Sequence, residues 1–231
     1  NNFPVIIEKG YDPDPQTLGW MGHYLLVKGY NDNTGMFSTH DSYVRANYEY
    51  EYDYIDQMWQ HFNYTYLVLY PADRRVELDA ILGEDSDERL NLINSFYRAQ
   101  DQSQVDESDK WAWVNMGASL TGLGEYEDAA KAFDQARSLG LPWRLLWYQF
   151  EMMEAYHQVG RYQDVLTMAN RNLNDGGGHF VEETFYYGGL AREGLGEYNR
   201  AIANYQQALA FNPNFEPAQD ALTALQSQLN S

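Results

Sequence analysis

The hydrophobic and polar positions of the chain follow two different periods, and the change falls near residue 76. Before it, short segments rich in β-branched and aromatic residues are separated by Gly, Pro, Asn and Asp, which predicts strands within residues 3–10, 23–31, 35–42 and 64–71. The sequence NDNTG should turn the second strand back on the third, because Asn and Gly tolerate positive φ. We therefore expect an antiparallel sheet.

Helical spacing replaces this alternation in three segments. Between the third and fourth strands, apolar side chains recur at the spacing of a short helix, at Tyr54, Ile55, Met58, Trp59 and Phe62. Residues 87–100 are amphipathic and predict a helix that joins the sheet to the C-terminal helices. Residues 216–229 carry a leucine- and alanine-rich face and a polar face, which predicts a closing helix.

The strongest feature of the sequence is a repeat. Gly124, Gly160 and Gly196 each begin a Gly-x-Tyr motif, and they stand thirty-six residues apart. This interval is close to the period of about 34 residues that is typical of helix-turn-helix arrays. The units around the first and third motifs share small, aromatic and proline positions, which serve close helix approach, gap filling and closure. They resemble tetratricopeptide repeats.

The middle repeat departs from that pattern. Met152 and Met153 stand where small residues are expected, and Val165 and Ala169 replace an alanine and a large aromatic residue. We assign it as a degenerate repeat on its period alone. The predicted fold class is α+β, with an antiparallel sheet domain over residues 1–75, connecting helices over 76–107, and about three repeats with a closing helix over 108–231.

Composition narrows the possible functions. A formal net charge of -19 repels nucleic acid and anionic membranes. No apolar stretch reaches the roughly 18 to 20 residues of a membrane helix, so we expect neither membrane insertion nor an anchor. The absence of cysteine excludes disulfides, thiolate metal sites and a cysteine nucleophile within these residues. We expect no metal and no cofactor, and the abrupt start with a strand predicts a fragment of a longer protein.

The first helices of the repeats should line a concave face. Aligned on the Gly-x-Tyr motifs, that face carries Trp111, Val114, Ala118, Thr121, Trp147, Phe150, Glu154, His157, Glu183, Tyr186, Leu190 and Glu193. It is aromatic and acidic and lacks the Lys and Arg that would clamp a carboxylate terminus, so an extended apolar or basic peptide fits best. Alternatively, these aromatic residues pack against the sheet domain or a neighbouring helix.

A second candidate site lies in the sheet domain. His23 opens an apolar strand, and Asp41 ends the next one across the NDNTG turn, so strand pairing would bring them close. A carboxylate on one imidazole nitrogen fixes the tautomer and makes the other nitrogen more basic. The alternatives are a structural histidine, or His40, which strand alternation points to the opposite face. A metal site is disfavoured, because His23, His40 and Asp41 lack the tight helical spacing of metal ligands and His61 lies on a different element.

The motifs of residues 3–71 resemble a known peptidase domain. FPVII, GHYLLVKGYND, THDS and YLVLYP together look like the C-terminal half of a papain-like cysteine peptidase of the bacteriocin-processing type, which trims double-glycine leader peptides. The resemblance implies that His23 is the general base and Asp41 orients it. It also implies that residues 10–22 form a wall of the cleft, that Trp20 stacks over it, and that the site is extracytoplasmic. The nucleophile-bearing N-terminal half is not in this chain.

The sequence supports three hypotheses. The first is a cysteine-peptidase-like protein whose repeats recruit a peptide or protein, inactive as this chain alone and active when joined to the missing half. The second is a non-catalytic peptide- or protein-binding scaffold, with a degenerate peptidase domain and working repeats. The third, an oligomerising adaptor, rests only on the repeats.

Overall fold

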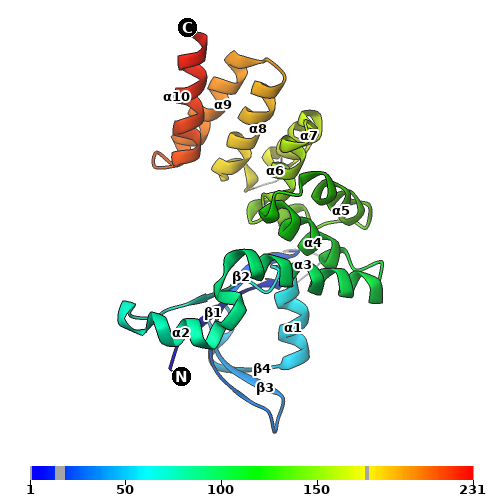
Figure 1. Ribbon diagram of the computed structural model, residues 1–231, viewed down its shortest axis with the longest axis vertical. Helices are drawn as coiled ribbons and strands as arrows, with labels where there is room; N and C mark the ends of the chain where they lie inside the picture. Colours follow the sequence, from blue (N-terminus) through cyan, green and yellow to red (C-terminus); the bar gives the residue numbers. More distant parts are fainter. Residues whose placement is uncertain (1, 14–18, 175–176, 231) are drawn as a thin grey trace. The chain divides into compact units, whose positions relative to one another are not determined.

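The computed structural model describes residues 2–13, 19–174 and 177–230. The chain divides into two compact units, Asn1–Ser119 and Leu120–Ser231 (Figure 1). The division falls within helix α4, Lys110–Leu123, and so lies later than the predicted start of the repeats at residue 108. The first unit holds a five-stranded antiparallel sheet and the second is helical, which confirms the predicted α+β class.

The sheet of the first unit has the strand order β4-β3-β2-β1-β5, and every neighbouring pair is antiparallel. The strands span Val5–Tyr11, Met21–Asn31, Met36–Asp41, Arg45–Glu51 and Tyr66–Val68, from β1 to β5. The predicted turn joins β2 to β3, and Gly35 has a φ of +66° with its amide donating to the Asn31 carbonyl at 2.8 Å.

Strand β4 is absent from the prediction. Its sequence, RANYEYE, alternates tyrosine with polar residues, and Tyr50 is buried while Glu49 and Glu51 are exposed. This alternation is the pattern of a half-buried strand. The helical spacing that begins at Tyr54 hid this pattern in the sequence. Helix α1, Tyr52–Gln60, begins directly after it.

The core of the first unit lies between the sheet and α1 (Figure 1). Ile7 from β1, Leu25 from β2, Tyr50 from β4 and Ile55 from α1 form one buried cluster. Alternation sends the intervening residues to the other face of the sheet, where Tyr24 and Leu67 are more than half exposed. The face under α1 therefore carries the core and also the inward-facing polar residues of β1, β2 and β3.

Helical segments complete the first unit. Two short 3-10 helices, η1 Ala72–Arg74 and η2 Gly83–Ser86, flank α2, Arg75–Leu82, and α3 follows at Glu88–Val105. The Asp87 side chain caps α3 by accepting from the Leu90 amide at 2.9 Å. The start of α4 is tied to the end of α1, because the buried Asn115 amide donates to the Gln60 carbonyl at 2.8 Å.

The second unit is built from helix pairs. Its elements are α5 Tyr126–Ser138, η3 Trp143–Trp147, α6 Glu151–Gln158, α7 Tyr162–Asn174, η4 Gly178–Phe180, α8 Glu182–Gly194, α9 Tyr198–Phe211 and α10 Glu216–Leu229. Gly124, Gly160 and Gly196 stand at the three turns with φ of +82°, +76° and +74°, a conformation that favours glycine. The repeat motif therefore marks the turns, as predicted.

The middle repeat is irregular, as its sequence indicates. In place of one long first helix it has η3 and the short α6, and the large side chains Met152 and Met153 are buried there.

An ion-pair network joins the helices around the middle repeat. The Arg161 guanidinium makes bonds of 2.6 Å and 3.0 Å to the two carboxylate oxygens of Asp134 on α5, and Nε bonds Asp164 on α7 at 2.8 Å.

Two further properties bear on function. Among the residues described, no helix is long and apolar enough to cross a membrane. Within those same residues, no cluster of three or more His, Asp or Glu side chains is arranged to hold a metal ion.

Candidate functional site

Strand pairing in the first unit brings His23 and Asp41 together. In the sheet register Leu25 lies opposite Asp41, so His23, two residues earlier on the same face, reaches it from the neighbouring strand. The His23 Nε2 atom lies 2.9 Å from Asp41 Oδ1. The Asp41 side chain is fully buried, whereas 12% of the His23 side chain is exposed. One imidazole edge is therefore held while the ring remains reachable from solvent.

Asp41 is a fully satisfied carboxylate. Besides His23, its Oδ1 accepts from the backbone amides of Tyr43 at 2.8 Å and Val44 at 3.0 Å, and its Oδ2 accepts from the Tyr50 hydroxyl at 2.7 Å. Burial by itself would raise the pKa of Asp41, but the hydrogen bonds from Tyr50, Val44 and Tyr43 and the attraction of His23 hold it below its ordinary value. The group is thus a fixed negative charge beneath the imidazole.

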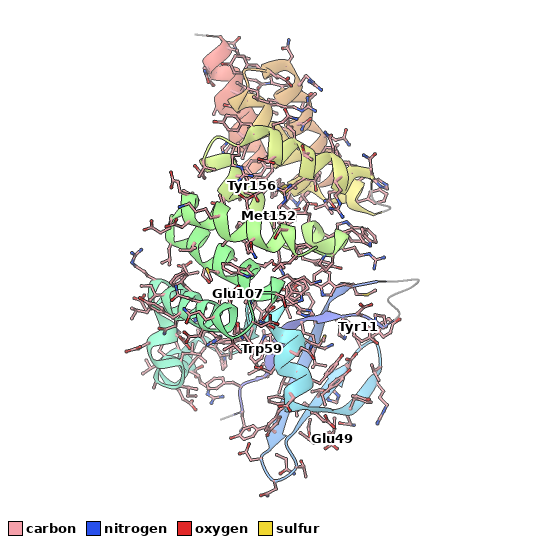
Figure 2. The ribbon with its side chains drawn as sticks, turned by 90° about the vertical axis from the view of Figure 1, so that its right-hand side faces the viewer. Tyr11, Glu49, Trp59, Glu107, Met152 and Tyr156 are labelled. Carbon is pink, nitrogen blue, oxygen red and sulfur yellow. The ribbon has the colours of Figure 1, made fainter. Side chains whose placement is uncertain are left out.

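The bond to Asp41 uses Nε2 and leaves Nδ1 for other chemistry. In the part of the chain that the structure describes, Nδ1 has no hydrogen-bond partner, and the ring lies beside Tyr11 and Tyr43 at centroid distances of 5.3 Å and 6.3 Å. Figure 2 shows Tyr11 at the end of the sheet opposite Glu49. The arrangement can hold an imidazole in one tautomer and present a basic nitrogen, but the chain has no cysteine for it to activate.

A buried lysine beside this pair is a feature that sequence reasoning missed. Lys9 lies opposite His23 in the sheet, is 0% exposed, and places Nζ 4.8 to 5.5 Å from the ring centroids of Tyr11, Tyr50 and Tyr54. Burial lowers the pKa of Lys9 to about 8, and Asp41 opposes that shift. The alternation of β1 could have revealed it, because position 9 shares the inward face with position 7.

Trp20 and Trp111 are not at a cleft surface; each is only 7% exposed. Trp20 Nε1 donates to His61 Nδ1 at 3.0 Å, and the His61 ring stacks on Trp111 at a centroid distance of 4.0 Å. Burial, with smaller contributions from nearby Lys110 and Lys9, lowers the pKa of His61 to about 3. These three side chains form a neutral aromatic core, which argues against the predicted ligand-binding roles of both tryptophans.

The remaining predictions in the sheet domain have mixed outcomes. His40 lies on the other face from Asp41, as alternation requires, and its Nδ1 accepts from the Asn47 amide at 3.2 Å. The predicted cleft wall, residues 10–22, falls partly outside the described residues. The catalytic roles of His23 and Asp41 remain predictions.

The second unit contains a groove that gathers half of the predicted concave face. Its volume is about 490 Å³, and it is lined by Phe150, Glu154, His157, Gln158, Glu183, Tyr186, Tyr187, Leu190, Phe215 and Pro217. The lining comes from the segment beginning at Phe150, from α8 and from the start of α10. Six of these residues were predicted from repeat geometry, and Gln158, Tyr187, Phe215 and Pro217 were not.

Aromatic rings and carboxylates line the groove together. Phe150 stacks on Tyr187 at a centroid distance of 6.2 Å, and Tyr186 meets Phe215 edge to face at 5.6 Å. Burial raises the pKa of both Glu154 and Glu183. A carboxylate whose charge is disfavoured by burial gains from a cation, so the groove is suited to a basic side chain flanked by apolar groups.

Three predicted residues of this unit, Thr121, Trp147 and Glu193, lie outside the groove lining. Trp147 is displaced by the local fold. It belongs to η3 and packs edge to face on Trp143 at a centroid distance of 5.4 Å. A Cβ on Gly177 would approach the Trp147 ring to 2.4 Å, so the indole fills space against that glycine. The irregular start of the middle repeat removes Trp147 from the position that regular repeat geometry assigns.

The fold defines the class as an α+β protein with a helical repeat region. No protein-family profile and no curated protein matches the chain. Solved structures of MamA are similar in fold. MamA 41-end from Desulfovibrio magneticus RS-1 has 17% identity and a TM-score of 0.53, covering 67% of this chain and 85% of that one.

Two other MamA structures agree. A MamA RS-1 ArsTM double mutant has 17% identity, a TM-score of 0.52, and coverage of 67% of this chain and 85% of its own. A further crystal structure of MamA has 14% identity and a TM-score of 0.50, with 70% and 87% covered. These similarities support the helical repeats. They give no support to the resemblance between the sheet domain and a papain-like peptidase.

Proposed function

We propose that this protein is a peptide- or protein-binding scaffold whose helical repeats hold a partner segment in the groove of the second unit. The observation that supports this most is that residues predicted to share one face, among them Phe150, His157 and Tyr186, line a single groove of about 490 Å³. Its volume falls within the range of about 300 to 1,000 Å³ that is typical of ligand sites. MamA, a protein with tetratricopeptide repeats, provides the structural parallel.

The lining also favours a partner chemistry. It offers four aromatic rings and the carboxylates of Glu154 and Glu183, with no Lys or Arg. Such a groove repels a carboxylate terminus and attracts an extended segment that carries a basic residue between apolar ones.

A binding experiment tests this proposal. Fluorescence anisotropy with a library of short peptides containing Arg or Lys next to Leu or Phe should yield binders, and Tyr186→Ala should weaken them at least tenfold. Phe180→Ala is the matched control, because Phe180 is 61% exposed on the same unit and lies outside the groove. Equal binding by wild type and Tyr186→Ala would rule the groove out.

A second candidate function rests on the His23–Asp41 geometry. A buried carboxylate that holds one imidazole nitrogen, with the other nitrogen unpaired among the residues described, suits a general base in nucleophilic catalysis. The corresponding proposal is a peptidase-like protein that requires a nucleophile from outside these residues. The longest natural form of the protein, treated with an iodoacetamide probe, should label a cysteine in a manner lost in His23→Ala. Equal labelling of the wild type and the His23→Ala variant would contradict this proposal.

A further inference from the structure

Strand β5 ends the sheet and has one unpaired edge. It pairs with β1 alone, through Glu8 N–H donating to the Thr65 carbonyl at 3.2 Å and Leu69 N–H donating to the Pro4 carbonyl at 3.1 Å. Backbone groups alternate in direction along a strand, so the N–H and C=O of Tyr66 and Val68 point away from β1. Within the described residues, no protein group pairs with them.

A large cavity lies along this same edge. Its volume is about 930 Å³, and its lining includes Tyr66 and Val68 of β5, residues of α2 and α3, and Trp59, which is labelled in Figure 2. The apolar side chains of Leu78, Leu82 and Leu92 also belong to the lining. The two residues that carry the unpaired backbone groups therefore line a hollow.

The chemistry of the cavity specifies an extended main chain. Half-buried N–H and C=O groups are costly when unpaired, and a neighbouring strand satisfies both kinds at the correct spacing. The lining holds three carboxylates, of Asp56, Asp85 and Glu88, and two arginines. The Arg75 guanidinium bonds Asp79 at 2.6 Å, and that of Arg98 lies 4.9 Å from the Tyr64 ring centroid, so the carboxylates of the lining outnumber its arginines. The charge therefore favours basic residues between the apolar ones.

We propose that the cavity between β5 and helices α2 and α3 binds an extended peptide segment of a partner protein, which adds a sixth strand to the sheet. Apolar side chains at alternate positions face Leu78, Leu82 and Leu92, and basic residues stand between them. This site is separate from the groove of the second unit and does not depend on it.

The probe is a fluorescein-labelled octapeptide in which valine alternates with lysine, with binding followed by anisotropy and amide hydrogen exchange. Two analogues carry N-methyl groups either on every valine or on every lysine. Because successive amides point to opposite sides of a strand, one analogue should lose at least tenfold in affinity and the other should bind like the parent. Equal binding by all three peptides would show charge attraction alone and overturn the proposal.

Two variants locate the site. Val68→Pro removes an outward N–H without touching a hydrogen bond to β1, and should weaken binding at least tenfold. If circular dichroism shows that this variant is unfolded, Leu82→Trp provides the test. Its larger side chain fills the cavity from α2 and should weaken peptide binding. Its matched control is Val76→Trp, on the same helix but 81% exposed and outside the lining.

Hydrogen exchange separates the occupants. Added peptide should slow exchange at the Tyr66 and Val68 amides. Slow exchange there without peptide, together with a dimer by light scattering, would assign the edge to a second copy and contradict the proposal. Protection confined to residues of the second unit would contradict it as well.

Discussion

At the level of single residues, Asp41 is the most constrained polar group of the first unit. Its two oxygens accept from Tyr50, from the Tyr43 and Val44 amides, and from His23 if that nitrogen carries the proton. A neutral amide in its place cannot accept at both ends. Asp41 therefore organises the end of β3 whether or not His23 acts as a base.

We expect Asp41→Asn to lower the free energy of unfolding by about 2 to 4 kcal/mol at pH 7, because buried donors lose an acceptor. The pKa of Asp41 is lowered in the folded state, so its contribution is full above the unfolded pKa near 4 and is lost as the pH falls through the folded value. The difference between wild type and variant in urea unfolding should be constant from about pH 7 to 5 and shrink below about pH 4.

Asp32→Asn is the control for that experiment. Asp32 also accepts from a tyrosine hydroxyl, that of Tyr52 at 3.0 Å, but it is exposed. Its replacement should cost less than about 0.5 kcal/mol. An equal cost for both variants would mean that burial adds nothing to the role of Asp41.

Lys9 carries the opposite kind of prediction. Its folded pKa of about 8 lies below the ordinary 10.5, so the folded state holds fewer protons between these values and wild-type stability rises with pH across that window. Lys9→Met removes the buried charge and should stabilise the protein by about 1 to 3 kcal/mol at pH 7. That gain should shrink between pH 8 and about pH 10.

Urea unfolding at several pH values measures this, with Lys28→Met as the exposed control. Burial raises the pKa of Tyr11, Tyr50 and Tyr54, the tyrosines beside Lys9, so these hydroxyls stay mostly neutral in this pH range. A gain that is the same at pH 7 and pH 10 would show that packing, and not the buried charge, is responsible.

At the level of elements, close helix approach holds the third repeat together. A Cβ on Gly189 of α8 would lie 2.4 Å from Cε1 of Tyr205, whose ring is fully buried on α9 and whose hydroxyl donates to Glu193 at 2.7 Å. The glycine is therefore the space into which the tyrosine packs. This is the physical content of the small-residue position in the repeat pattern.

We expect Gly189→Ala to lower the melting temperature, with a loss of about 1 to 3 kcal/mol from overpacking. An exposed helix would instead gain up to about 1 kcal/mol from the same change. Gly188→Ala is the comparison, because its nearest neighbour is the end of the flexible Asn204 side chain and should yield more easily. A smaller loss for Gly189→Ala than for Gly188→Ala would show that the tyrosine ring does not set the limit.

Elements written locally in the sequence were predictable, and those that depend on distant packing were not. Gly124, Gly160 and Gly196 mark turns because positive φ favours glycine, and that signal needs no tertiary context. Half of the predicted concave face lines one groove, because the repeat period that predicted it is also a local signal. Trp20 and Trp111, by contrast, are buried through His61, a partner many residues away from either tryptophan.

At the level of the whole molecule, the charge of -19 creates a field that attracts any basic segment, so attraction alone does not identify a site. Specific binding in the groove of the second unit requires a contribution from Glu154 and Glu183 beyond that field. Both carboxylates lie in the groove and are partly desolvated, which makes their attraction for a bound cation less sensitive to screening.

The double variant Glu154→Gln with Glu183→Gln should therefore lower the affinity for a basic-aromatic peptide by about tenfold or more at 150 mM salt. This loss is equivalent to about 1.4 kcal/mol. The control variant, Glu125→Gln with Glu127→Gln, changes the net charge by the same amount at exposed positions of the same unit. It should lower the affinity for the peptide by less than about twofold. Isothermal titration calorimetry at 50 and 500 mM salt measures both. Equal losses in the two double variants, abolished together at high salt, would show that the field of the molecule and not the groove holds the peptide.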